Sequence, residues 1–330
     1  MKLSDFDYYL PKELIAQYPS RRRDSCRMLV LDRRSGRIEH CIFRDILVYL
    51  NPGDLLVLNN TRVRTCRLRA RRKTGGAVEV FLLRQKHGLC FDVMLRPARV
   101  KQGECVFFSN TGITGTLTGA NEVTFDAPDA DAVYSLGQIP LPPYIKREPE
   151  AMDSVYYQTV YAESDGSVAS PTAGLHFTKP LLGRVMRKGV DVEHVTLHVG
   201  LGTFKPVTSE DIREHAMQEE YYTIPPRAQA ALARARASRT ARIVCAGTTT
   251  CRALESYADG RAEGSTGIFM YPGHRFRLID CLLTNFHLPR TTLFMLVCAF
   301  AGTALAHAAY AEAVREKYRF YSYGDAMLIV

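Results

Sequence analysis

The sequence contains no Cys-x-x-Cys pair, although nine of its 330 residues are cysteines. An odd cysteine count without that spacing favours neither a disulfide framework nor a zinc ribbon, and reduced thiols fit best. No apolar run follows Met1, and the first seven residues include two aspartates, which argues against a secretory signal peptide. We therefore expect a cytoplasmic protein without a metal site.

Long hydrophobic runs are also scarce, and only residues 291–311 are long and uncharged enough to suggest a membrane span. The second half of this segment is rich in alanine and contains Gly302 and His307, so a buried helix, or a strand followed by a helix, explains it better. The net charge of +9 favours an anionic partner, and nucleic acid before membrane.

Both ends of the chain have the pattern of an α/β domain. Apolar runs at 28–31 and 54–58 are typical of buried strands, and a helix is expected between them at 43–50. In the second half we expect helices at 179–189, 225–238, 251–257 and 304–318, and strands at 190–199, 241–246 and 276–283.

The middle of the chain differs from both ends. Short β-prone stretches follow one another there without a helical period, at 77–84, 90–95, 105–109, 115–118 and 123–126. Five or more such strands indicate a small barrel. We predict one α/β domain formed by residues 1–62 and 150–330, with a small all-β barrel inserted at 63–149.

The start of the expected barrel is strongly basic. Seven cations fall within twelve residues: Arg62, Arg64, Arg67, Arg69, Arg71, Arg72 and Lys73. They indicate either a face that contacts nucleic-acid phosphates or a solvated strand edge that the charges protect from pairing.

A small-molecule site is indicated by two segments, 167–178 and 194–204, where glycines, hydroxyls and histidines stand in place of bulky core residues. His194, Thr196 and His198 alternate with apolar residues, so they share one face of a strand. Without a His-Glu-x-x-His pattern, their spacing is a weak zinc signal. Glycines and a hydroxyl follow them, at Gly200, Gly202 and Thr203, and strengthen the case for a site.

Residues 242–257 read as a strand, a small polar turn at Thr248, Thr249 and Thr250, and a helix. Free amides and the helix dipole make such a turn an anion site, unless one threonine simply caps the helix. The turn matches neither Gly-x-Gly-x-x-Gly nor the P-loop, so a carboxylate or a ribose suits it as well as phosphate. Arg252 and Glu255, one turn apart, form either part of this site or an exposed ion pair.

Further candidates lie in the last third of the chain. His215, Gln218 and Glu219 are expected on one helical or turn face, as an acid/base cluster or as solvated surface. Tyr271 lies in a turn, and Asn285 and His287 follow a strand, where open α/β sheets bind their ligands. The aromatic segment 318–325 stacks bases or packs as a terminal plug.

Several sequence blocks in a fixed order cover the whole chain: Phe6–Tyr8, Leu14–Gln17, Gly53–Asn59, Pro171–Thr178, Val195–Gly200, Thr284–Pro289 and Tyr321–Leu328. Together they resemble the S-adenosylmethionine:tRNA ribosyltransferase-isomerase family of the queuosine pathway. The resemblance implies the same architecture, an α/β domain with an inserted barrel. It also implies transfer and isomerisation of the ribosyl part of S-adenosylmethionine onto 7-aminomethyl-7-deazaguanine at the tRNA wobble position, which gives epoxyqueuosine and releases adenine and methionine.

The resemblance also suggests roles for the candidates. Because the reaction needs a base and an acid, we predict His198 or His176 as the base and His215 with Glu220 as the proton partner on the leaving side. The residues predicted to bind substrate are Thr172, Gly174, Thr248, Thr249, Thr250, Arg252, Tyr271, Asn285 and His287. Those predicted to bind tRNA are Arg62, Arg67, Arg69, Arg71 and Arg72. S-adenosylmethionine is consumed, so no separate cofactor is implied, and we expect a monomer.

The chain departs from the family pattern at three positions. Asn60 stands where the family usually has aspartate, Gln218 where it has a second histidine, and Ser170 where it has alanine. Two other functions remain open on the residues alone. One is an S-adenosylmethionine-dependent RNA methyltransferase. Such an enzyme needs a glycine-rich loop, and residues 31–36 match that loop poorly. The other is a non-enzymatic RNA-binding module.

Overall fold

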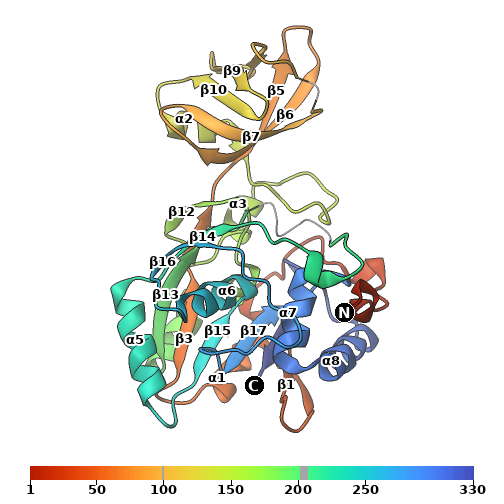
Figure 1. Cartoon of the computed structure of the whole chain (residues 1–330), viewed down its shortest axis with the longest axis vertical. Coiled ribbons are helices and arrows are strands. Elements are labelled where there is room, and N and C mark those ends of the chain that lie inside the picture. The colour runs from red at the N-terminus through yellow and green to blue at the C-terminus, as the bar shows by residue number, and fades with distance from the viewer. Residues whose placement is uncertain (99, 201–206) are drawn as a thin grey trace.

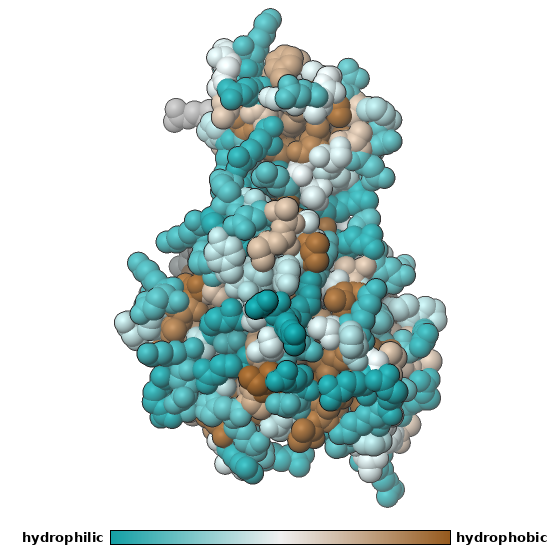
Figure 2. All heavy atoms as spheres, turned by 180° about the vertical axis from the view of Figure 1, so that it is seen from behind, coloured by the Kyte–Doolittle hydropathy of each residue, from teal (hydrophilic) through white to brown (hydrophobic). Residues whose placement is uncertain are grey.

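The computed structural model describes residues 1–98, 100–200 and 207–330. Figure 1 shows a small β-barrel above a larger α/β body that contains both termini. On the face seen in Figure 2, hydrophilic side chains cover most of the surface, and apolar residues form scattered groups, one of them on the barrel.

The described strands of the large body are β1 (Arg27–Leu31), β2 (Ile38–Ile42), β3 (Leu55–Asn59), β13 (Asp191–Leu197), β14 (Glu220–Thr223), β15 (Ile243–Ala246), β16 (Glu263–Thr266), β17 (Cys281–Asn285) and β18 (Ala326–Ile329). They form one sheet in the order β16-β14-β13-β3-β15-β17-β18-β1-β2. The central strands β13, β3, β15 and β17 run parallel to their neighbours in that series. Their carboxyl ends therefore meet at one edge of the sheet.

Helices cover both faces of this sheet, because alternate residues of its central strands are buried on opposite sides. Leu55 and Val57 belong to the core beneath α5 (Pro226–Ala237), α6 (Thr248–Tyr257), α7 (Thr292–Ala301) and α8 (Thr303–Arg315). Leu56 and Leu58 belong to the core beneath α1 (Ile46–Tyr49) and α4 (Lys179–Arg187). The Thr178 side chain accepts a hydrogen bond from the Leu181 amide at 3.2 Å and so caps the N-terminus of α4.

Residues 291–311, expected to form one helix or a strand and a helix, form parts of two helices instead. Gly302, with φ of 89°, separates α7 from α8. No single helix in the described ranges is long and apolar enough to cross a membrane; only α7 and α8 taken together pass that test, and they are bent by 115°.

The inserted all-β barrel is confirmed. Its described strands are β5 (Arg67–Arg72), β6 (Ala77–Gln85), β7 (Cys90–Arg96), β8 (Cys105–Phe107), β9 (Thr114–Gly119), β10 (Glu122–Asp126) and β11 (Gly137–Gln138), with α2 (Ala130–Ser135) before the last. Strands β5-β6-β7-β10-β9-β8 are antiparallel neighbours, and pairing of β8 with β5 closes the circle. Domain boundaries at 62/63 and 149/150 stay a prediction.

Two short parallel strands connect the barrel to the body. β4 (Thr61–Val63) leads into the barrel, and β12 (Ser164–Ser167) pairs with it after the chain has returned. The returning segment carries α3 (Asp153–Tyr156) and packs Ile139 and Tyr157 in one apolar cluster with Tyr323 near the C-terminus. This packing brings residues of the return segment to the carboxyl edge of the large sheet.

Candidate active site

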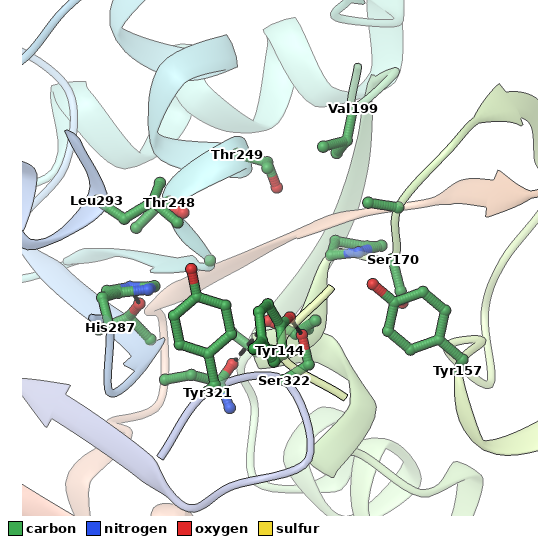
Figure 3. A pocket seen from close by; sticks show the side chains of 17 residues that line it. Tyr144, Tyr157, Ser170, Val199, Thr248, Thr249, His287, Leu293, Tyr321 and Ser322 are labelled. Carbon is green, nitrogen blue, oxygen red and sulfur yellow. Dashed lines mark hydrogen bonds between the residues drawn. The ribbon is translucent and has the colours of Figure 1, made fainter. Parts of the chain in front are cut away.

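A cavity of about 560 Å³, its open mouth included, lies at the carboxyl ends of β13, β15 and β17 (Figure 3). This is the position that the strand order favours for a ligand. Its lining residues are Tyr144, Tyr157, Ala169, Ser170, Pro171, Thr172, Ala173, Val199, Gly247, Thr248, Thr249, Thr284, Asn285, His287, Leu293, Tyr321 and Ser322. Five of the residues that the sequence predicted for substrate binding are therefore brought together here: Thr172, Thr248, Thr249, Asn285 and His287.

The N-terminus of α6 opens on this cavity. The helix begins at Thr248 and not at Cys251, so the three threonines lie in its first turn and not in a turn before it. Gly247, with φ of 100°, is the N-cap and has no side chain, so the alternative that a threonine caps the helix is wrong. The first amides of a helix have no partner within it and lie at the positive end of its dipole, which suits an anion.

The three threonines of this turn have different surroundings. Thr248 and Thr249 line the cavity, and the Thr249 hydroxyl accepts a hydrogen bond from the Asn59 amide nitrogen at 3.2 Å. Thr250 is fully buried, and its hydroxyl donates to the Ala246 carbonyl at 2.6 Å. Thr250 therefore stabilises the helix start, and among the described residues it is not part of the cavity wall.

A chain of hydrogen bonds positions Asn285. Its Oδ1 accepts from the Thr172 hydroxyl at 3.0 Å, and its Nδ2 donates to His176 Nε2 at 3.0 Å. His176 Nδ1 lies 3.1 Å from Cys26 Sγ. Because Nε2 accepts, the proton of the neutral ring sits on Nδ1. Burial lowers the pKa of His176 to about 3, which keeps the ring neutral. His176 thus stands behind Asn285 and holds it, a positioning arrangement.

His287 is the histidine that lines the cavity among the described residues. Its Nε2 lies 2.8 Å from the Thr284 hydroxyl, and its backbone amide donates to the Tyr310 hydroxyl at 3.1 Å. Burial lowers the pKa of His287 to about 3. The ring is therefore a neutral, oriented imidazole at the cavity wall.

The wall opposite α6 consists of residues that sequence reasoning largely missed. Tyr144 and Tyr157 come from the return segment, and the Tyr144 hydroxyl is hydrogen-bonded to the Ser322 hydroxyl. Figure 3 shows Tyr321 across the cavity from Thr248 and Thr249. The only sequence feature that pointed to this wall was the aromatic C-terminal segment 318–325. Part of it packs in the core, as at Tyr318 and Phe320, whereas Tyr321 and Ser322 line the cavity.

His198, the first residue after β13, does not line the cavity. The predicted sharing of one face by His194, Thr196 and His198 is confirmed, because all three are partly exposed while the intervening residues are buried. His198 Nδ1 lies 2.8 Å from the Thr61 hydroxyl of β4, and its ring packs on Gly166 of β12. The neighbouring Val199 lines the cavity in its place. A catalytic role for His198 stays a prediction.

Glu220 and Arg252 form a buried ion pair away from the described cavity wall. Glu220 Oε1 also accepts from the Gly200 amide at 2.9 Å, and Arg252 donates to the Thr266 carbonyl at 3.2 Å. The alternative of an exposed Arg252–Glu255 pair is wrong, because Glu255 is fully buried and accepts from backbone amides, that of Leu278 at 3.0 Å among them. These contacts join strand ends to α6.

Three other candidate residues, His215, Tyr271 and Gly174, pack against aromatic side chains. His215 and Tyr271 both contact the Phe269 ring, with centroids 5.5 and 5.1 Å away. His215 follows the 3-10 helix Ile212–Glu214, so no helical face unites it with the exposed Gln218 and Glu219. A Cβ on Gly174 would lie 2.0 Å from the Tyr161 hydroxyl, so close packing requires glycine there.

Two other expectations from the sequence concern the segment after His198 and the weak zinc signal of His194 and His198. Gly202 and Thr203 lie outside the described residues. Within the described ranges, no group of three His, Cys, Asp or Glu side chains is arranged to hold a metal ion.

The arginines at the start of the barrel are mostly paired with carboxylates. Arg67 contacts Glu79, Arg69 contacts Glu148, and Arg72 Nη2 lies 2.7 Å from Glu104 Oε2. Arg62 Nε lies 3.9 Å from an Asp165 oxygen. Arg71 is exposed and has no carboxylate partner among the described residues. The strand therefore carries less uncompensated charge than its sequence indicates.

Comparison with known proteins gives a consistent result. The family described as "Queuosine biosynthesis protein" matches residues 3–329. An S-adenosylmethionine:tRNA ribosyltransferase-isomerase of Sulfurihydrogenibium sp. (strain YO3AOP1) is 51% identical, with 100% of both chains aligned. A relative of the same name from Citrifermentans bemidjiense is 48% identical over 100% of both chains. A crystal structure of S-adenosylmethionine tRNA ribosyltransferase from Thermotoga maritima is similar with a TM-score of 0.58 and 38% identity, over 99% of this chain and 100% of that chain.

Proposed function

The chain belongs to the queuosine biosynthesis protein family, and from this premise we propose that the cavity at the carboxyl ends of β13, β15 and β17 is its reaction site. The protein is an enzyme that transfers and isomerises the ribosyl group of S-adenosylmethionine onto tRNA. The acceptor that we propose is 7-aminomethyl-7-deazaguanine at the wobble position. The products are then epoxyqueuosine-tRNA, adenine and methionine.

The observation that carries this assignment is the α6 N-terminus on the cavity wall. Thr248 and Thr249 line the cavity and lie in the first turn of α6, whose amides have no partner within the helix. The methionine carboxylate of S-adenosylmethionine is an anion that such a helix end stabilises. We assign that carboxylate to this turn, with Thr249 as a side-chain partner.

We propose that proton transfer is carried out by cavity residues outside the α6 N-terminus. The reaction needs a base for the proton made acidic by the sulfonium and an acid for the departing adenine. His287 lines the cavity, and burial keeps its imidazole neutral in the free protein. Asn285, fixed by Thr172 and His176, presents an amide beside it. We therefore favour His287 as the proton-transferring imidazole and His176 as a positioning residue.

Docking of tRNA is proposed on the barrel, with Arg71 as the most available cation of β5. Phosphate contacts of this kind position RNA without reading its sequence. The wobble base must leave its stack to reach the cavity. We further propose that the protein acts as a cytoplasmic monomer without a separate cofactor.

Product analysis tests this function. Purified protein is incubated with S-adenosylmethionine and tRNA carrying the deazaguanine precursor, and the released small molecules are separated by chromatography. Adenine and methionine in equal amounts are expected. S-adenosylhomocysteine would indicate methyl transfer, and binding of tRNA without any product would indicate an RNA-binding module.

A further inference from the structure

Two hydroxyl groups on the tyrosine side of the cavity are buried without a good hydrogen bond. Ser170, which is 6% exposed, has an oxygen with no hydrogen-bond partner among the described residues. Tyr157 is fully buried, and its hydroxyl also lacks a well-formed bond within the described part, although Ser322 and the Ser170 backbone lie near it. Both residues line the cavity, and a buried hydroxyl in this state is costly.

The surroundings of these hydroxyls are aromatic and uncharged. Tyr144 and Tyr321 belong to the same wall and their rings are in contact. Figure 3 shows Ser170 and Tyr157 together on one side of the cavity, separate from Thr248 and His287. Burial raises the pKa of the Tyr157 hydroxyl, so the group stays protonated and remains a donor. Aromatic rings beside neutral hydroxyls suit a flat heterocycle and not an anion.

We propose that Ser170 and Tyr157 are the hydrogen-bonding edge of a nucleobase subsite, with the rings of Tyr144 and Tyr321 as its aromatic wall. A purine-like base presents ring-nitrogen acceptors and amino donors along one edge, and a hydroxyl pairs with either. The proposal rests on the proposed function, in which two such bases take part. One is the adenine of S-adenosylmethionine, and the other is the 7-deazaguanine of tRNA.

Calorimetry with fragments of the two substrates tests the subsite in the full-length protein. The probes are 5′-methylthioadenosine, free 7-aminomethyl-7-deazaguanine and L-methionine. Ser170→Ala and Tyr157→Phe each remove one hydroxyl, and each is expected to weaken binding of one base probe about fivefold, the scale of one hydrogen bond. Affinity for L-methionine is expected to stay unchanged. Ser154→Ala, on the exposed side of α3, is the matched control.

A second measurement separates this role from a structural one. Because Ser170→Ala removes an unpaired buried hydroxyl, the melting temperature of the free protein is expected to stay equal or to rise while base affinity falls. The base probe that loses affinity identifies which base occupies the subsite. Unchanged affinity for both bases in both variants, or a loss confined to L-methionine, overturns the proposal. Normal base binding by a wild type that releases no adenine would refute the proposed function and leave the subsite standing.

Discussion

The cavity of the α/β body and the arginine-rich strand β5 of the barrel differ in whether their polar groups have partners within the protein. The cavity keeps hydroxyl groups and first-turn helix amides at a buried wall, and the Ser170 hydroxyl has no partner among the described residues. On β5, Arg67, Arg69 and Arg72 each have a glutamate partner. A buried unpaired group is satisfied by a ligand, whereas a surface ion pair needs none. At these two places, the unpaired Ser170 hydroxyl therefore indicates a ligand more directly than the density of arginines does.

The largest effect is expected from the imidazole that lines the cavity. His287→Ala should lower the rate of adenine release by about 10²-fold or more, the usual scale for a positioned proton-transfer group. His198→Ala removes an imidazole that follows β13 and does not line the cavity, and it should cost less than about tenfold. Single-turnover rates of both variants, with folding checked by circular dichroism, make the comparison. If His198→Ala lowered the rate more than His287→Ala, we would assign the proton transfer to His198.

His176 distinguishes positioning from catalysis. His176→Ala leaves Asn285 Nδ2 with only the Asp325 carbonyl, 3.4 Å away, as an acceptor, so Asn285 is held less firmly and turnover should fall by up to about 10²-fold. His176→Gln places an oxygen near the position of Nε2 and should restore most of the rate, because it keeps an acceptor for Asn285. Turnover rates over a pH series measure both variants. If the glutamine variant were as slow as the alanine variant, His176 would itself transfer protons.

A smaller effect is expected at the helix N-terminus. Thr249→Val replaces a cavity hydroxyl with a methyl group that cannot hydrogen-bond, and should weaken S-adenosylmethionine binding about tenfold. Thr250→Val is the matched control, since the Thr250 hydroxyl bonds to Ala246 and not to the cavity. Titration calorimetry gives both dissociation constants. Equal affinities in the two variants would show that α6 does not hold the cosubstrate.

The smallest effect is expected on the barrel. Arg71→Gln should weaken tRNA binding a few-fold and flatten the dependence of log affinity on log salt by about one phosphate contact. Arg72→Gln, which removes a cation already paired with Glu104, should change that slope less. Salt titrations of tRNA binding compare them, with S-adenosylmethionine affinity as the internal control. Wild-type slopes in both variants would place tRNA elsewhere, for example on the arginines of α5.

Local patterns were sufficient to predict the architecture and one half of the cavity. The short strands between Gly-rich turns predict the barrel, and the carboxyl ends of parallel strands bring Thr249 and Asn285 together. Helix and strand starts were less well predicted, since α6 begins three residues earlier than expected and β17 begins at Cys281 and not near Phe276. The first residue of a helix or strand depends on tertiary contacts, and the periodicity of the sequence does not report these contacts.

The other half of the cavity was not predictable, because it forms only when distant segments dock. Tyr144 and Ser322 share a hydrogen bond across 178 residues of sequence. The same limit applies to charge. The sequence shows the arginines of β5, but their partners Glu104 and Glu148 reach them only in the folded barrel.

We expect S-adenosylmethionine to bind between the α6 N-terminus and the aromatic wall formed by Tyr144 and Tyr321. Hydrogen–deuterium exchange with and without S-adenosylmethionine tests it most directly, because it reports protection segment by segment. We predict that saturating ligand slows exchange in residues 170–173, 247–251 and 284–287, and leaves β5 of the barrel and residues 194–198 unchanged. Protection confined to residues 194–198 or to the barrel, with the 247–251 segment unaffected, would show that S-adenosylmethionine does not bind at the α6 N-terminus.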